Sequence, residues 1–146
     1  MDNFEATVSI DRPIEQVFDF LVDGENDKKI SARVLEIKKK TDGPIRAGTV
    51  YASTVKDFGL KTEREFELEV VERPTRIRWR ELSNAPVTVP EGGYDLVTEG
   101  TGTKVTLFNE LAARGLGTFV KGFALRSARK NADGMVRSIK AEIEAE

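Results

Sequence analysis

Apolar and polar positions alternate along much of the chain between residues 3 and 111, and this period of two is typical of half-buried β-strands. The alternation predicts strands over residues 3–10, 33–39, 48–57, 60–72, 76–82, 87–97 and 103–111. Turn segments separate several of these strands, at 42–44, 58–59 and 99–102. Because these connections are hairpin-sized, we expect an antiparallel sheet.

Two segments have the helical period of 3.6 residues instead. Ile14, Val17, Phe18 and Leu21 are spaced as one face of a helix that begins after Pro13 and ends near residue 22. The polar residues 23–29 predict a second short helical turn or a loop. A long helix is predicted from about residue 116 to the C-terminus. Its apolar stripe comprises Leu116, Phe119, Val120, Phe123, Ala124, Ala128, Ala132, Val136, Ile139 and Ile143.

Strands grouped in one run, with helices outside the run, indicate an α+β fold. The clearest alternation lies in residues 60–72, which place two sets of side chains on opposite faces. The inward set is Thr62, Arg64, Phe66, Leu68 and Val70, and the outward set is Glu63, Glu65, Glu67 and Glu69. If Val70 lies opposite Ile77, then Glu67 meets Arg80 and Glu69 meets Arg78 across the hairpin. We expect a solvated, ion-paired outer face, with a site for an acidic or phosphate partner as the alternative.

The composition of the chain excludes several classes of catalytic and structural site. The chain has 146 residues, a net charge of −2 and neither cysteine nor histidine. These absences exclude disulfides, thiol nucleophiles, zinc-thiolate sites and imidazole catalysis. The charge argues against nucleic-acid binding, and the sequence suggests no metal and no cofactor. We expect a single domain over residues 1–146 that is soluble and cytoplasmic, has no membrane span, and is a monomer or weak homodimer.

Four segments carry motifs in a characteristic order. They are 10–21 (IDRPIEQVFDFL), 48–51 (GTVY), 70–79 (VVERPTRIRW) and 100–107 (GTGTKVTL). In these motifs the chain resembles the START-like or SRPBCC superfamily, specifically its bacterial polyketide cyclase/dehydrase-like members. The resemblance covers nearly the whole chain. It implies a helix-grip fold, in which a curved seven-stranded antiparallel sheet wraps around the long C-terminal helix and encloses a cavity. Members bind lipids, hormones, polyketides and other apolar small molecules.

Arg64 is a cation on an inward face that otherwise carries Phe66 and Leu68. An unpaired buried charge is costly, so we expect a partner. The predicted register places Glu81 opposite Phe66 and diagonal to Arg64. The pair could form the polar end of the cavity, where the guanidinium binds a ligand carboxylate or phenolate. Alternatively, twist or a bulge carries both groups to the end of the sheet, where they meet water.

Other residues are further candidates for the ligand site. Trp79 could stack on an aromatic ligand or fill the core, and Phe119 and Phe123 could line the cavity or belong to the core. Tyr51 and Asn109 are candidates for hydrogen bonding, with structural roles as the alternative. The predicted ligand-binding set is therefore Arg64, Glu81, Trp79, Phe66, Leu68, Tyr51, Asn109, Phe119 and Phe123. No catalytic residue is assigned.

Three functions fit these observations. The first is a cofactor-free protein that binds an apolar or aromatic small molecule between the sheet and the last helix. The second is a polyketide aromatase/cyclase or dehydratase-type enzyme, in which Arg64, Glu81 or a tyrosine moves protons. The absence of histidine argues against this enzyme, because acid–base work at neutral pH would need a group with a strongly shifted pKa. The third is a protein-interaction module of the chaperone-activator type that uses the outer face of the sheet.

Overall fold

The computed structural model describes residues 2–57, 59–115 and 117–146. Its elements are β1 (Asp2–Ile10), α1 (Ile14–Val22), the 3-10 turn η1 (Gly24–Asn26), α2 (Asp27–Ile30), β2 (Val34–Lys39), β3 (Val50–Asp57), β4 (Leu60–Glu72), β5 (Arg76–Glu81), β6 (Val87–Thr88), β7 (Gly92–Glu99), β8 (Gly102–Ala113) and α3 (Gly117–Glu144). The predicted α+β order is confirmed. Phe58, Leu116 and the side chain of Val120, which the sequence assigned to a turn and to the helical stripe, lie outside the described residues.

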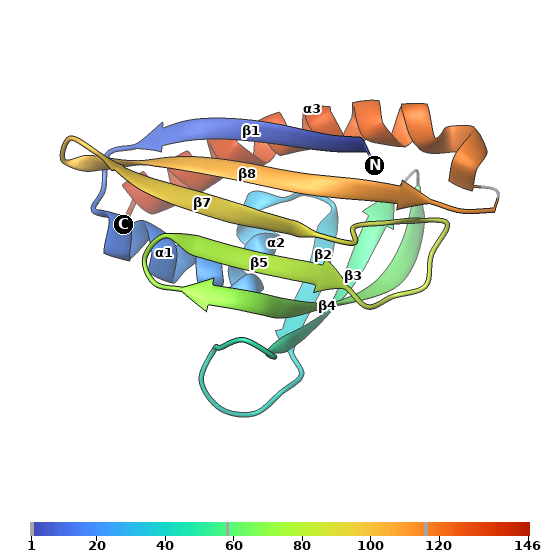
Figure 1. Ribbon diagram of the computed structural model, residues 1–146, viewed down its shortest axis with the longest axis horizontal. Coiled ribbons are helices and arrows are strands. Elements are labelled where there is room, and N and C mark those ends of the chain that lie inside the picture. Colours follow the sequence, from blue (N-terminus) through green and yellow to red (C-terminus); the bar gives the residue numbers. More distant parts are fainter. Residues whose placement is uncertain (1, 58, 116) are drawn as a thin grey trace.

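The strands form a curved antiparallel sheet in the order β1-β8-β7-β5-β4-β3-β2, and β6 pairs separately with the end of β8. The long helix α3 runs along β1 and β8, and α1 and α2 lie on the same side of the sheet (Figure 1). This arrangement is the expected helix-grip fold. The concave face of the sheet therefore forms one wall of the interior, and the three helices form the other.

One predicted strand, 87–97, is divided in two. Val87 and Thr88 pair with Ala113 and Ala112 of β8, whereas β7 begins at Gly92 and pairs with β5 and β8. Pro90 lies between the two strands and has no backbone N–H to donate to a ladder. Regular strand pairing is therefore interrupted over residues 89–91, although the carbonyls of Val89 and Glu91 still accept the N–H groups of Glu81 and Glu110. β6 forms a short flap at the end of β8.

A β-bulge in β4 changes the predicted register. Phe66 pairs with Glu81 and Glu67 with Arg80, as expected. After the bulge between Leu68 and Val70, however, Val71 pairs with Ile77. The predicted pairing of Val70 with Ile77 is therefore wrong, because the extra residue at a bulge advances one strand by one position. Val71 packs against the core in the place that the alternation gave to Val70.

The bulge also rearranges the ion pairs on the outer face. Arg80 lies 3.0 Å from Glu67 and 3.6 Å from Glu69. Arg78 does not meet Glu69 as predicted; its guanidinium lies 2.8 Å from Asp95 on β7. The outer face is ion-paired as expected, but one of its two predicted cross-strand pairs joins different partners.

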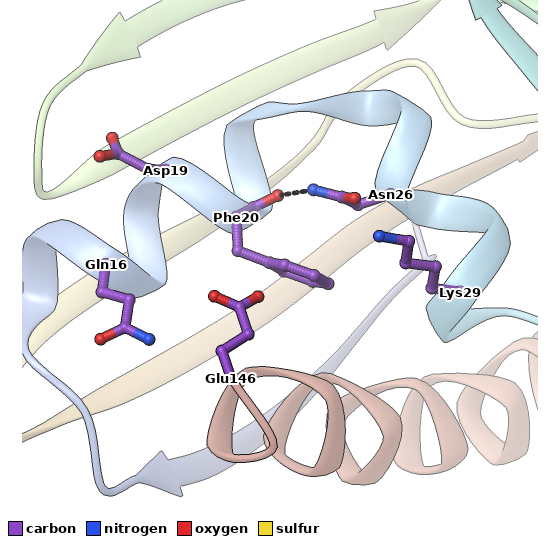
Figure 2. A pocket seen from close by; sticks show the side chains of 6 residues that line it. All are labelled: Gln16, Asp19, Phe20, Asn26, Lys29 and Glu146. Carbon is purple, nitrogen blue, oxygen red and sulfur yellow. Dashed lines mark hydrogen bonds between the residues drawn. The ribbon is translucent and has the colours of Figure 1, made fainter.

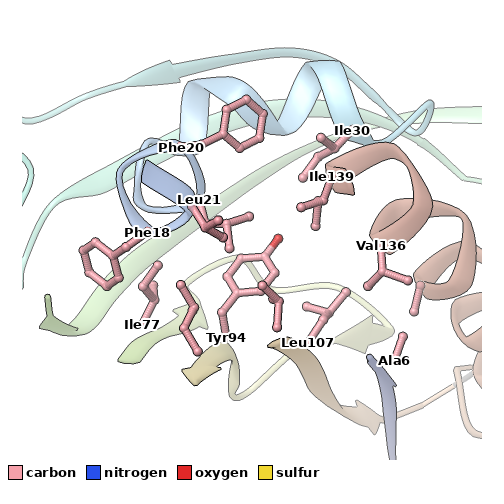
Figure 3. Close-up of a cluster of buried hydrophobic side chains, with 14 of the residues drawn as sticks. Ala6, Phe18, Phe20, Leu21, Ile30, Ile77, Tyr94, Leu107, Val136 and Ile139 are labelled. Carbon is pink, nitrogen blue, oxygen red and sulfur yellow. The ribbon is translucent and has the colours of Figure 1, made fainter. Parts of the chain in front are cut away.

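The core lies between the middle of the sheet and the helices. Side chains from α1, β5, β7, β8 and the second half of α3 converge there (Figure 3). The most deeply buried include Ile10, Val17, Phe18, Ile77, Leu107, Ile139 and Ile143. From Ala124 onward the predicted helical stripe is confirmed, since Ala124, Ala132, Val136, Ile139 and Ile143 are buried and Ala128 packs against the core.

The first half of α3 departs from the prediction. Phe119 is 85% exposed and Phe123 is 58% exposed, so neither is a core residue. At about 100° per residue, Phe119 lies about 140° around the helix axis from Ala132, thirteen positions later. The predicted stripe was too wide to belong to one face. The structure resolves it into a buried stripe that faces the sheet and two phenylalanines that face outward.

Candidate functional site

Three neighbouring cross-strand rows on the concave face bring together seven of the nine predicted ligand-binding residues. One row joins Ser53 and Arg64, the next joins Tyr51, Phe66 and Glu81, and the third joins Leu68, Trp79, Gly92 and Asn109. The rows are neighbours because residues two apart on a strand point to the same face. Phe119 and Phe123 lie outside this group on the outer side of α3.

The aromatic residues of these rows form two ring contacts. The Tyr51 and Phe66 rings are stacked, with centroids 5.7 Å apart, and the Trp79 ring meets Tyr94 edge-on at 5.2 Å. Tyr51, Leu68 and Tyr94 are fully buried, whereas Phe66 and Trp79 are half-buried. Each contact therefore joins one core aromatic to one that still has accessible surface on the concave face.

Gly92 allows two polar side chains to approach the floor of this surface. A Cβ atom at position 92 would lie 2.0 Å from Asn109 Oδ1 and 2.5 Å from Trp79 Nε1. A larger residue would therefore displace both side chains. Sequence reasoning missed this role, although glycine inside a strand pattern is a known sign of close approach.

Arg64 and Glu81 form a partly buried ion pair, as predicted. Arg64 Nη1 lies 2.7 Å from Glu81 Oε2, and their side chains are 17% and 9% exposed. The same guanidinium donates to the Val87 carbonyl at 3.1 Å and lies 3.8 Å from Asp57. Glu81 in turn accepts the backbone N–H of Val89 at 2.9 Å.

These contacts decide what the ion pair can do. Two carboxylates already offset the charge of Arg64, and its hydrogen bonds hold the β6 flap against β4 and β5. The arrangement favours a structural clamp over a receptor for an acidic ligand. A ligand on this face would meet the edge of a neutralised pair, next to Phe66.

Two open hollows lie elsewhere. One, of about 450 Å³, lies between α1, α2 and the end of the chain and is lined by Gln16, Asp19, Phe20, Asn26, Lys29 and Glu146 (Figure 2). The other, of about 390 Å³, lies between α2 and α3. Neither is lined by Arg64, Glu81 or Trp79. The hollows are thus separate from the predicted ligand-binding rows.

An acidic group and two tyrosines form a second polar feature of the interior. Burial, with a smaller contribution from the charge of Asp23, raises the pKa of Asp27 to about 7. Burial likewise raises the pKa of Tyr51 to about 12 and that of Tyr94 well above its usual value, and the charge of Asp27 adds to both shifts. Among the described residues, the buried Tyr51 hydroxyl has no hydrogen-bond partner.

The chemistry of this cluster is that of a proton donor and acceptor. A carboxyl with a pKa near 7 exchanges its proton at neutral pH, and the two tyrosines stay protonated. Sequence reasoning did not single out Asp27, which lies in the polar segment 23–29. Nothing in the local sequence distinguishes it from its neighbours, because its pKa depends on the burial created by tertiary packing.

Comparison with known proteins identifies the family and the fold. Residues 1–144 match the family described as polyketide cyclase / dehydrase and lipid transport. No curated protein sequence matches significantly.

Among solved structures, a protein from Thermus thermophilus superposes with a TM-score of 0.83 at 19% identity, covering 99% of this chain and 98% of that chain. The Zhui aromatase/cyclase of Streptomyces sp. R1128 superposes with a TM-score of 0.80 at 18% identity, covering 98% and 93%. The di-domain aromatase/cyclase BexL gives a TM-score of 0.74 at 19% identity, covering 99% of this chain and 50% of that chain. At these identities the likeness establishes the fold.

Proposed function

Because the chain belongs to the polyketide cyclase / dehydrase and lipid transport family of the START-like (SRPBCC) superfamily, we propose that it binds an apolar or aromatic small molecule. The ligand lies on the concave face of the sheet, over Phe66 and Trp79. The observation that carries the proposal is the partial exposure of these two aromatic rings beside fully buried neighbours on the same face, among them Tyr51, Leu68 and Tyr94. An apolar ligand there would cover the ring surface that is still accessible to water. Such a surface is typical of ligand sites, which are mostly apolar with a few polar groups that fix the orientation of the ligand.

The polar groups beside this surface suggest the ligand class. Asn109 offers an amide next to Trp79, and the Arg64–Glu81 pair is already neutralised. A neutral or phenolic aromatic therefore fits better than a carboxylate, which would have to compete with Glu81 for the guanidinium. This preference revises the expectation that Arg64 binds an acidic ligand.

Titration by tryptophan fluorescence tests the proposal, because Trp79 is the one tryptophan in the chain. We expect flat phenols and neutral aromatics to change its emission, and Phe66→Ala to weaken their binding roughly tenfold. The matched control is Val97→Ala, which alters an apolar residue that is 61% exposed on β7. Unchanged affinity in Phe66→Ala, or equal weakening in Val97→Ala, would count against this site.

One observation favours an enzyme as the second candidate. The Asp27 carboxyl has a pKa of about 7 and acts electrostatically on Tyr51 and Tyr94, which contact Phe66 and Trp79. Its shifted pKa makes Asp27 a candidate to donate or accept a proton during cyclisation or dehydration of a bound polyketide. Asp27→Asn should then abolish turnover of a linear polyketide analogue while leaving its binding intact. Turnover by the variant at the wild-type rate would remove Asp27 from the chemistry.

A further inference from the structure

The first half of α3 belongs to a strongly basic segment. Residues 111–132 contain five cationic residues and no acidic one, in a chain whose net charge is −2. The cations are Arg114, Lys121, Arg126, Arg129 and Lys130. These five cations lie along the end of β8 and the first half of α3, where the helix begins beyond the end of that strand (Figure 1).

Two cations and two aromatic residues share the outer face of this half-helix. Phe119, Phe123, Arg126 and Lys130 are separated by four, three and four positions, so they form one stripe along the helix. All four are exposed, Phe119 to 85% and Phe123 to 58%. Within the described part of the chain, the side chains of Arg126 and Lys130 make neither an ion pair nor a hydrogen bond. We call these four residues the basic-aromatic stripe.

We propose that the basic-aromatic stripe docks the protein on an anionic lipid surface. Aromatic rings on an amphipathic helix insert at the boundary between headgroups and acyl chains, and lysine or arginine beside them contacts anionic headgroups. The stripe has both components, with no acidic residue among them. Phe119, Phe123 and Arg126 line neither of the two hollows described above, and only Lys130, at the end of the stripe, borders the hollow between α2 and α3. Exposed rings beside cations on a helix surface fit a deformable lipid surface.

The docking is peripheral. In the parts of the chain that the structure describes, no helix is long and apolar enough to cross a bilayer. The buried face of α3 stays against the sheet, since Val136, Ile139 and Ile143 are fixed in the core. The outer face is therefore able to contact lipid without unfolding the domain.

Vesicle sedimentation tests the proposal. We expect wild-type protein to pellet with vesicles that contain phosphatidylglycerol and not with pure phosphatidylcholine vesicles, and to dissociate as salt is raised. Arg126→Glu/Lys130→Glu should weaken binding at least tenfold. Phe119→Ser/Phe123→Ser should weaken it by a similar factor, because the rings no longer insert.

The chain offers a matched control. Val97 and Lys104 are an exposed apolar residue and an exposed cation that pair across β7 and β8, away from the start of α3. Val97→Ser/Lys104→Glu makes the same kinds of change and should bind vesicles as the wild type does. The stripe variants should remain folded, with melting temperatures within a few degrees of the wild type, because the four side chains are mostly exposed. Arg126→Gln/Lys130→Gln provides a milder charge change.

Three outcomes of the vesicle experiments would overturn the docking. They are absence of binding to phosphatidylglycerol vesicles, equal binding by the stripe variants and the wild type, and equal loss in the control. Capture of an acidic protein by the stripe without vesicle binding would also overturn it, in favour of a protein partner. Because Phe66 and Trp79 are not altered, failure here leaves the proposed ligand site untouched.

Discussion

Arg64 on β4 donates a 2.7 Å hydrogen bond to Glu81 on β5, and both side chains are largely buried. The same two residues hold both ends of the β6 segment, Arg64 through the Val87 carbonyl and Glu81 through the Val89 N–H. The pair thus connects the hairpin of β4 and β5 to the flap at the end of β8. Its loss should affect folding more than ligand selection.

Arg64→Met tests that distinction. The variant leaves Glu81 without its cation, and breaking a buried pair in this way costs several kcal/mol. Since the pair keeps some exposure, we expect a loss of about 2–3 kcal/mol in urea unfolding at neutral pH. Arg64→Met/Glu81→Gln removes the bare carboxylate while keeping an acceptor for Val89, and should recover part of that loss. Unchanged stability together with weaker binding of acidic ligands would instead make Arg64 a ligand anchor.

Gly92→Ala should disturb the floor of the proposed site. The new Cβ would overlap Asn109 Oδ1 and Trp79 Nε1, so the indole must move. We expect a destabilisation on the order of 2 kcal/mol and a shifted Trp79 emission maximum in the absence of ligand. Gly122→Ala is the control, because a Cβ there meets nothing within 4 Å and alanine favours a helix. That variant should be more stable by about 0.5–1 kcal/mol. Wild-type stability and emission in Gly92→Ala would contradict the close approach.

The two halves of α3 should respond differently to truncation. Ile139 is fully buried, so Ile139→Ala should cost about 2–5 kcal/mol. Phe123 is 58% exposed, and Phe123→Ala should cost less than about 1 kcal/mol. Chemical denaturation of the two variants under one set of conditions makes the comparison. Equal, full-sized losses would mean that Phe123 packs in the core, as the periodicity alone suggested.

Phe66, Val71 and Phe123 show which side-chain orientations could be predicted from the sequence and which could not. Strict alternation from Thr62 to Leu68 is a local property, so it predicted the facing of Phe66 and the proximity of Arg64 and Glu81. The bulge after Leu68 has no signal in the alternation, because both Val70 and Val71 are apolar. The orientation of Phe123 could not be predicted for a similar reason. The apolar residues of α3 cover most of its circumference, and tertiary packing decided which of them face the sheet.

The same distinction applies to the residues of the candidate site. Strand parity predicted that Trp79 faces the inside of the sheet, and the structure places it there; the facing of Asn109 was left open by the sequence. Gly92 and Asp27 were not identified from the sequence, because their roles depend on approaches between elements distant in the chain. A pKa shift of the size found at Asp27 arises from desolvation, which no local pattern encodes.

The free energy of unfolding should depend on pH through the titration of Asp27. The pKa of this carboxyl is raised from 3.8 to about 7 by burial, so the folded state binds the proton more tightly than the unfolded state. Its protonated form therefore stabilises the fold at low pH, and this contribution is lost as the pH rises from about 4 through about 7. Asp27→Asn removes the titration, so it should match the wild type near pH 4 and exceed its stability at pH 8 by up to about 4 kcal/mol, the free energy of a pKa difference of about three units. Urea unfolding of both proteins across this range makes the measurement, with Asp42→Asn in an exposed loop as the control. Parallel profiles for the wild type and Asp27→Asn would show that the carboxyl is ionised in the folded protein at neutral pH, and with that result Asp27 would lose its place as a proton donor in the enzyme candidate.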